Sequence, residues 1–287
     1  MVDTLQLDKS PKRASGQRTA SRFPPWQFVR DIYHETSWYQ RKRQAKRAVK
    51  VARRRQRDAE IVANVFENDL TVRSGLFQGM RYIDSACGSH LLPKLLGSYE
   101  EQLFDWIRAF DGRYRTVINV GCAEGYFAVG LVFAGLTDHV LAYDINPRAL
   151  ELASRLAALN GLQDAVEFHS KCDHDELSNQ IRPDTLIFCD IEGHELTLLD
   201  PEKCPALRTC DIVFEAHDVL ISDLTDTITQ RFSDTHEISV VYDTDRASSR
   251  YPVLAGWPES IAEVVLDEER PIGMSWVRML SRQDISS

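Results

Sequence analysis

Carboxylates and a histidine are concentrated in two short segments of this chain, CDIEGHE at 189–195 and FEAHD at 214–218. Side chains of these types can take a proton from an acceptor hydroxyl. They can also hold a divalent cation, which lowers the pKa of the acceptor and positions it. The residues that could carry such chemistry are Asp190, Glu192, Glu195, Glu215, His217 and Asp218.

The two kinds of chemistry use overlapping sets of these residues. A general-base mechanism uses Asp190, Glu192 and His217, whereas a metal site uses Asp190, Glu215 and His217. In a purely structural interpretation, Glu192 or Glu195 caps the helix that follows, where a carboxylate is favoured. The sequence predicts an acceptor site here and leaves the choice between base and metal open.

A glycine turn between two apolar runs lies upstream of these segments. The run TVINV at 116–120 predicts a buried strand that enters a turn at Gly121 and leaves as a helix after Gly125. Such a turn presents backbone N–H groups to a ligand. Asp144 ends the next apolar run, 23 positions after Gly121, close to the offset of about 20 residues at which an acid meets ribose hydroxyls. This pattern predicts an adenosine-containing cofactor.

The composition of the turn favours S-adenosylmethionine over a dinucleotide. A dinucleotide fold requires G-x-G-x-x-G, whereas the turn here is GCAEG at 121–125 and lacks the middle glycine. Glu124 would repel a pyrophosphate but attract the ammonium and sulfonium of a methyl donor. The predicted cofactor contacts are Glu100, Asn119, Gly121, Cys122, Glu124, Gly125, Tyr126, Asp144, Ile145, Asn146, Cys172, Asp173 and Asp190.

Short apolar runs alternate with helical patterns along the body of the chain, which predicts a doubly wound, mostly parallel α/β sheet. The expected strands span 116–120, 139–144, 165–169, 185–189 and 211–216, with two more in ISVVYD and SWVRML, and the expected helices span 98–110, 125–135, 147–160 and 194–200. Ligands of such sheets bind beyond the carboxyl ends of the strands. Asp144, Asp173, Asp190 and His217 fall at those ends.

The N-terminal part of the chain differs from the body in composition. Residues 1–25 are polar and are expected to be a disordered tail. Residues 26–70 lack Pro and Gly and predict a basic helical extension of one long or two shorter helices. Residues 71–110 contain a hairpin and a loop that could cover the site as a lid, and 111–287 form the cofactor-binding domain.

The charge of the chain is distributed unevenly. Ten Lys or Arg residues lie in 41–57, so the remaining residues carry −19 although the whole chain carries −9. Such an acidic body does not suit a general nucleic-acid binder, so nucleic acid is not the expected partner. The basic helix could be solvated, bridge copies in a homo-oligomer, or contact an anionic membrane surface or an acidic partner.

The cysteines and the N-terminus indicate a soluble, cytoplasmic protein. The six cysteines contain no C-x-x-C pair, and the first residues contain no apolar signal core. No run reaches the roughly 18 apolar residues that a membrane span requires.

Five motifs in the same order resemble the FkbM-type methyltransferase family, a class I S-adenosylmethionine-dependent group. They are GLFQGMRY, LLPKLLGSYEEQL, INVGCAEGYFA, YDINPRALELASRLAALNGL and CDIEGHE, and they cover about residues 71–217. The positions that match the family pattern are Gly121, Gly125, Tyr126, Asp190, Glu192, Gly193 and Glu195. The resemblance implies a small-molecule or glycan acceptor, with methylation of a hydroxyl on a sugar or on a secondary metabolite such as a polyketide.

The chain departs from the family pattern in the first strand and its turn. Asn119 stands where an acid is common, and Cys122, Ala123 and Glu124 replace the interior of a G-A-N-x-G turn. Glu124 or Glu100 would then contact the methionine ammonium. Two other classes stay open: a nucleic-acid or protein N-methyltransferase, and a non-catalytic cofactor-binding module. DIEG after the fourth strand lacks the Pro-Pro-aromatic segment expected for holding a flipped base.

Overall fold

The computed structural model describes residues 37–110, 112–270 and 273–282. The chain divides into two units, residues 1–57 and 58–287, which are described here separately. The tail predicted at 1–25 lies outside the described residues. The predicted division at 70 and 110 stays a prediction.

A single helix, α2 (Ser37–Asn64), accounts for the described part of the basic segment. Its length fits the absence of Pro and Gly from 26–70, since these two residues are the strongest helix breakers. Lys42, Lys46, Lys50 and Arg53 are exposed. The helix contains no acid before Asp58, so acids that could form i,i+4 pairs with its basic residues lie only near its C-terminal end.

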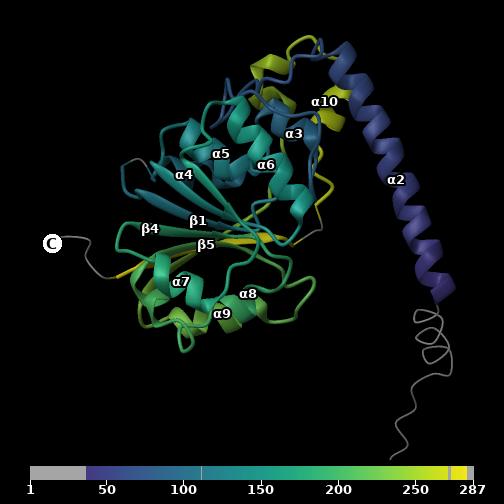
Figure 1. The fold of residues 1–287 in the computed structure, drawn as a ribbon. Coiled ribbons are helices and arrows are strands. Elements are labelled where there is room, and N and C mark those ends of the chain that lie inside the picture. The colour runs from purple at the N-terminus through teal and green to yellow at the C-terminus, as the bar shows by residue number, and fades with distance from the viewer. Residues whose placement is uncertain (1–36, 111, 271–272, 283–287) are drawn as a thin grey trace, which may run out of the picture. The chain divides into compact units, whose positions relative to one another are not determined.

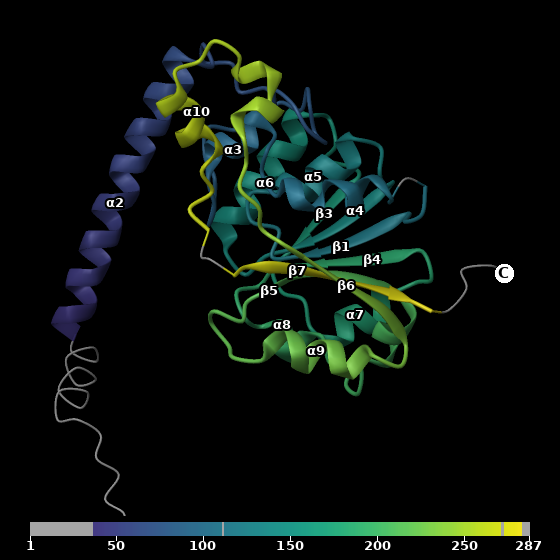
Figure 2. The same ribbon diagram turned by 180° about the vertical axis from the view of Figure 1, so that it is seen from behind.

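The second unit is built on one mixed sheet of seven strands in the order β3-β2-β1-β4-β5-β7-β6 (Figures 1 and 2). The strands are β1 (Thr116–Val120), β2 (His139–Tyr143), β3 (Val166–His169), β4 (Thr185–Cys189), β5 (Asp211–Ala216), β6 (His236–Tyr242) and β7 (Ser275–Ser281). The first five are parallel, and β7 runs antiparallel between β5 and β6. The predicted mostly parallel α/β sheet is confirmed, and this strand order is that of class I methyltransferases.

Helices cover both faces of the sheet (Figure 1). One face carries α3 (Leu91–Leu96), α4 (Phe104–Arg108), α5 (Tyr126–Phe133), α6 (Pro147–Leu159) and α10 (Glu259–Leu266). The other carries α7 (His174–Gln180), α8 (Glu195–Leu198) and α9 (Leu224–Phe232), and short 3-10 turns span Glu101–Leu103, Pro205–Thr209, Ser248–Arg250 and Pro252–Leu254. No helix in the described ranges is long and apolar enough to cross a membrane.

Two apolar clusters fill the spaces between the sheet and its helices. Successive residues of one strand alternate between them: in β4, Leu186 and Phe188 join one cluster, and Ile187 and Cys189 join the other. Side chains in a strand point to opposite faces in turn. A continuous apolar run is therefore what a strand covered on both sides requires.

The helix expected at 98–110 is interrupted in the structure. Glu100 has a positive φ of 55°, and only a 3-10 turn and α4 follow it. A loop was expected at 91–96, but α3 forms there with Pro93 as its third residue. Proline is tolerated in a first helical turn because that turn has no intrahelical acceptor for its N–H. The predicted hairpin before it is reduced to one bridge between Thr71 and Arg81.

Candidate active site

The turn after β1 lies directly against the end of β4. Gly121 has a φ of 82°, and a Cβ built there would lie 1.6 Å from the carbonyl oxygen of Asp190. Only glycine fits such an approach without displacing backbone. The N–H groups of Gly121 and Cys122 both donate to the carbonyl of Tyr143, at 2.8 and 3.0 Å. The turn is thus fixed between β2 and β4, at the carboxyl edge of the sheet.

Asp144 is held by this turn. Its Oδ2 accepts a hydrogen bond from the N–H of Ala123 at 2.9 Å, and its Oδ1 accepts one from the N–H of Asn146 at 2.8 Å. The side chain is only partly buried, and each carboxylate oxygen keeps a lone pair for a ribose hydroxyl. Ile145 beside it is 85% exposed, and a cofactor contact from this residue stays a prediction.

Glu124 does not point into open space, although its charge suggested a contact with the methionine ammonium. Its carboxylate is fully buried and forms an ion pair with Lys94. It also accepts hydrogen bonds from Tyr82 Oη at 2.7 Å and from the N–H of Cys87 at 2.9 Å. This burial has a simple cause: the turn is covered by residues 82–94, which supply the counter-charge. A contact of Glu124 with the methionine ammonium stays a prediction.

Glu100 is also fully buried and engaged within the protein. It accepts a hydrogen bond from Trp276 Nε1 at 2.9 Å and forms an ion pair with Arg270. Asn119, where an acid was expected, donates from Nδ2 to the carbonyl of Phe188 at 3.2 Å. Asn119 Oδ1 is buried and has no hydrogen-bond partner among the described residues, and a cofactor contact from Glu100 or Asn119 stays a prediction.

The residues expected to flank the adenine lie after β3. Cys172 is partly buried. Asp173 caps α7, accepting a hydrogen bond from the N–H of Glu176 at 3.2 Å. Hydrogen bonding lowers the pKa of Asp173. An adenine contact from either residue stays a prediction.

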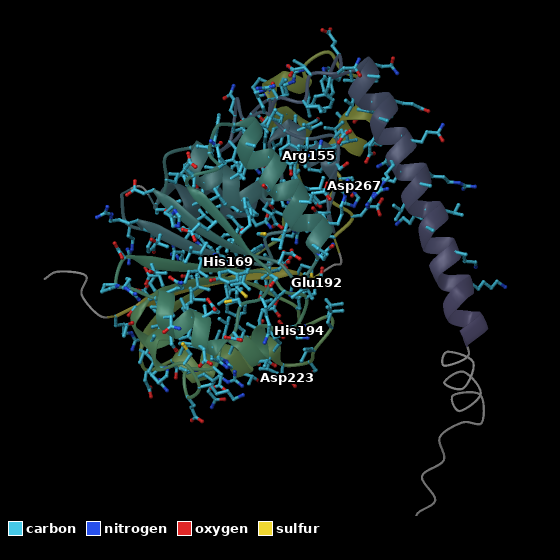
Figure 3. The ribbon with its side chains drawn as sticks, in the orientation of Figure 1. Arg155, His169, Glu192, His194, Asp223 and Asp267 are labelled. Carbon is cyan, nitrogen blue, oxygen red and sulfur yellow. The ribbon has the colours of Figure 1, made fainter. Side chains whose placement is uncertain are left out.

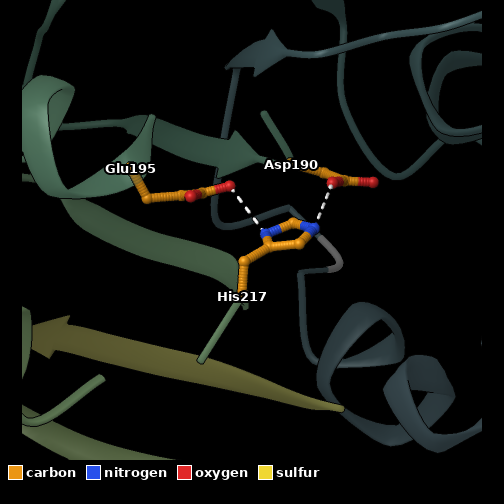
Figure 4. Close-up of side chains that lie close together, drawn as sticks. All are labelled: Asp190, Glu195 and His217. Atoms are coloured by element: carbon orange, nitrogen blue, oxygen red, sulfur yellow. Dashed lines mark ion pairs between the residues drawn. The ribbon is translucent and has the colours of Figure 1, made fainter. Parts of the chain in front are cut away.

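The two chemistry-bearing segments do meet, and His217 lies at their centre (Figure 4). Its Nδ1 lies 3.0 Å from Glu195 Oε1. Its Nε2 faces three more carboxylates: Glu215 Oε2 at 3.5 Å, Asp190 Oδ1 at 3.6 Å and Glu192 Oε2 at 3.7 Å.

These carboxylates differ in exposure and in role. The side chain of Glu195 is fully buried and also accepts the N–H of Ile191 at 2.8 Å, so it fixes the loop and the imidazole together. The side chain of Asp190 is 32% exposed and that of Glu192 is 79% exposed (Figure 3 labels Glu192). Asp218 instead binds Thr225 and is not part of this cluster. An acceptor would therefore reach His217 past Asp190 and Glu192.

Protons in the cluster are held more tightly than in isolated groups. Burial raises the pKa of Asp190 and, together with repulsion from Asp190, raises that of Glu215 well above its usual value. Arg270 contacts Glu215 and opposes this rise. Burial alone would lower the pKa of His217, but Glu195 and Asp190 outweigh it and the pKa is raised.

The residues that could hold a metal differ from the predicted set in one member. Ligand atoms of Asp190, Glu195 and His217 all lie within 4.8 Å of one another, whereas the prediction had Glu215 in the place of Glu195. Glu215 is shared with Arg270, and a guanidinium competes with a cation for the same oxygens. Lys94, Arg270 and Trp276 were not predicted as partners, because their contacts join segments far apart in the sequence.

No family model matches this chain. It is similar to ribosomal protein L11 methyltransferases from Vibrio cholerae, with 33% identity over 72 residues (25% of this chain, 24% of the relative), and from Alteromonas mediterranea, with 29% identity over 76 residues (26% of each). The chain thus spans about a quarter of the length of the curated relatives it matches.

Solved structures with a similar fold include an rRNA methylase from Streptococcus thermophilus, with a TM-score of 0.43, 13% identity and coverage of 62% of this chain and 92% of the other. Another is a ribosomal protein L11 methylase from Lactobacillus delbrueckii subsp. bulgaricus, with a TM-score of 0.41, 17% identity and coverage of 63% and 77%. The resemblance to the FkbM-type family stays a prediction. By its strand order and antiparallel β7, the chain has the fold of class I S-adenosylmethionine-dependent methyltransferases.

Proposed function

We propose that this protein transfers a methyl group from S-adenosylmethionine to an acceptor bound beside His217. The observation that carries the proposal is the contact between the turn at Gly121 and the backbone of Asp190. Because of it, the groups suited to the cofactor and the groups suited to the acceptor lie at one edge of the sheet. Asp144 would take the ribose and Ile145 would cover the adenine.

The transfer would be an in-line displacement. The bond from sulfur to the methyl carbon breaks as the bond from that carbon to the acceptor forms, and the sulfonium leaves as a neutral thioether. Alignment of the two reactants supplies much of the rate enhancement. The protein must also remove one proton from the acceptor, and His217 Nε2 is placed to receive it once it is deprotonated.

The charge of the site favours an amine as the acceptor. Four carboxylates surround His217. Arg270 offsets the charge of Glu215, and the exposed Glu192 and partly exposed Asp190 can attract an ammonium group. An amine with a pKa near 10 is also within easier reach of an imidazole base than an aliphatic hydroxyl is. The expected hydroxyl acceptor would need a stronger activator, such as a bound cation.

The loop after β5 offers a surface for the rest of such an acceptor. Val219 and Leu220 are 56% and 59% exposed, and this loop packs against Gly193 of the acidic segment. The aliphatic stem of a lysine can lie on such a surface while its charged end reaches the acids. The similarity to enzymes named as methyltransferases of a ribosomal protein supports a protein acceptor over a sugar.

The test is methyl transfer from labelled S-adenosylmethionine to matched acceptors. Lysine-containing peptides and a ribosomal protein fraction form one set, and sugar and polyketide hydroxyls form the other. We expect methylated amines as the product, and loss of turnover in His217→Gln but not in His194→Gln, which alters an exposed histidine on the same edge. Methyl ethers as the product would show that the acceptor is a hydroxyl and not an amine. Absence of methyl transfer to either set of acceptors would contradict the proposed function.

A further inference from the structure

The carboxylate of Glu124, in the turn at 121–125 (the cofactor turn), binds residues of the segment 82–94 that covers this turn. Glu124 lies between Ala123 and Gly125 in the turn, and it binds Tyr82, Cys87 and Lys94. Lys94 in turn donates to Ser89 Oγ at 2.6 Å. Positions spread over residues 82–94 are thus joined to the cofactor turn through one side chain.

The pair formed by Lys94 and Glu124 is costly to bury. The two side chains are 2% and 0% exposed, and the ammonium lies 4.6 Å from the ring centre of Tyr99 and 5.5 Å from that of Tyr126. Desolvation of two charges offsets most of their attraction, so apolar residues of similar volume are often as stable. Stability alone is therefore a poor explanation for an ion pair in this place, whereas fixing one conformation is a better one.

The turn needs such fixing at the residue before Glu124. Ala123 has a φ of 48°, a conformation that residues other than glycine rarely adopt. In this conformation its N–H donates to Asp144 Oδ2, at 2.9 Å. The neighbouring Glu124 is anchored on both carboxylate oxygens, so its backbone cannot rotate without breaking these bonds.

We propose that Lys94 and Glu124 are positioning residues for the cofactor: by holding residues 82–94 on the turn, they keep the Ala123 N–H and the Asp144 carboxylate oriented for the ribose. Neither charge contacts the cofactor itself. This inference rests on the proposed function, and it replaces the earlier expectation that Glu124 binds the methionine ammonium.

The experiment compares the binding of S-adenosylhomocysteine and of adenosine to Lys94→Met/Glu124→Leu. This double variant removes both buried charges, and Lys203→Met, which alters an exposed lysine, is the matched control. We expect the double variant to stay folded, by circular dichroism and thermal unfolding, and to bind both ligands about tenfold more weakly or worse, the scale of a lost charge-assisted hydrogen bond. Adenosine decides the matter because it contains the ribose but no methionine.

Each other result has a defined meaning. Unchanged affinity for both ligands in a folded double variant would make the pair merely structural. Weaker binding of S-adenosylhomocysteine with unchanged binding of adenosine would show that Glu124 contacts the methionine part directly. If the double variant does not fold, the same binding measurements are made on Tyr82→Phe, which removes one hydrogen bond to Glu124. This variant should weaken the binding of both ligands several-fold. Failure of the unaltered protein to bind S-adenosylhomocysteine would count against the proposed function.

Discussion

Replacing Glu195 by glutamine should weaken His217 as a base while leaving the shape of the site intact. Glu195 Oε1 lies 3.0 Å from His217 Nδ1, and both side chains are almost fully buried, at 0% and 4% exposure. A buried hydrogen bond to a charged group contributes about 1.5–3 kcal/mol. That interaction is stronger when His217 is protonated, which is why Glu195 raises the pKa of His217.

The sign of the pH effect follows from this raised pKa. The pair stabilises the fold fully at pH values below the unfolded pKa of histidine, and this stabilisation is lost as pH rises through the higher folded pKa. Glu195→Gln should therefore lower the free energy of unfolding more in mild acid than above neutrality, where only the bond from Ile191 is weakened. In the pH profile of kcat, the acid limb should move to lower pH and the plateau should fall, because a weaker base accepts the proton less readily.

Denaturant unfolding at several pH values, imidazole NMR and turnover assays measure these effects. Glu202→Gln, at an exposed position, is the control. An acid limb that stays in place in Glu195→Gln, with the NMR titration of His217 unchanged, would refute the reasoning.

Three further predictions concern the cofactor, the metal and the basic helix. Asp144→Ala should weaken the binding of S-adenosylhomocysteine by about 1.5–3 kcal/mol, as measured by calorimetry. An unchanged affinity, or tighter binding of NAD, would contradict the assignment of the ribose contact. Chelation should leave methyl transfer intact if His217 acts as a simple base, whereas complete loss that one added ion restores would assign a metal to Asp190, Glu195 and His217. Removal of residues 1–57 should preserve the affinity for S-adenosylhomocysteine, because the acids and the turn of the site all belong to the second unit. The same truncation should abolish salt-sensitive association with anionic vesicles. A folded truncated protein that cannot bind S-adenosylhomocysteine would contradict this prediction.

The sequence could predict the parts of the fold that repeat a simple pattern. The bounds of β1, β4 and β5 agree with the predicted ranges 116–120, 185–189 and 211–216, since strands buried on both faces are continuous apolar runs. The helices α7, α9 and α10 were not predicted, because they are short. Helices of this length depend on tertiary packing more than on their own propensity.

In the candidate site, too, the residues placed by local sequence patterns could be predicted, whereas contacts between distant segments could not. Asp190, Glu192 and His217 were brought together correctly, because parallel strands end at the same edge of a sheet. The ion pair of Glu124 was not predicted, because its partner Lys94 lies 30 residues away. Sequence spacing carries no record of such a pairing, since only the folded chain brings the two charges into contact.

The close approach of Gly121 to the carbonyl of Asp190 has a thermodynamic consequence. With no room for even one methyl group between them, neither backbone can move toward the other without displacing it. Cofactor that tightens the turn must also shift the population of Asp190 conformations that the acceptor meets. Linkage then requires an equal effect in the other direction, so a bound acceptor should change the affinity for the cofactor by the same factor. The two ligands of this edge are expected to bind cooperatively rather than independently.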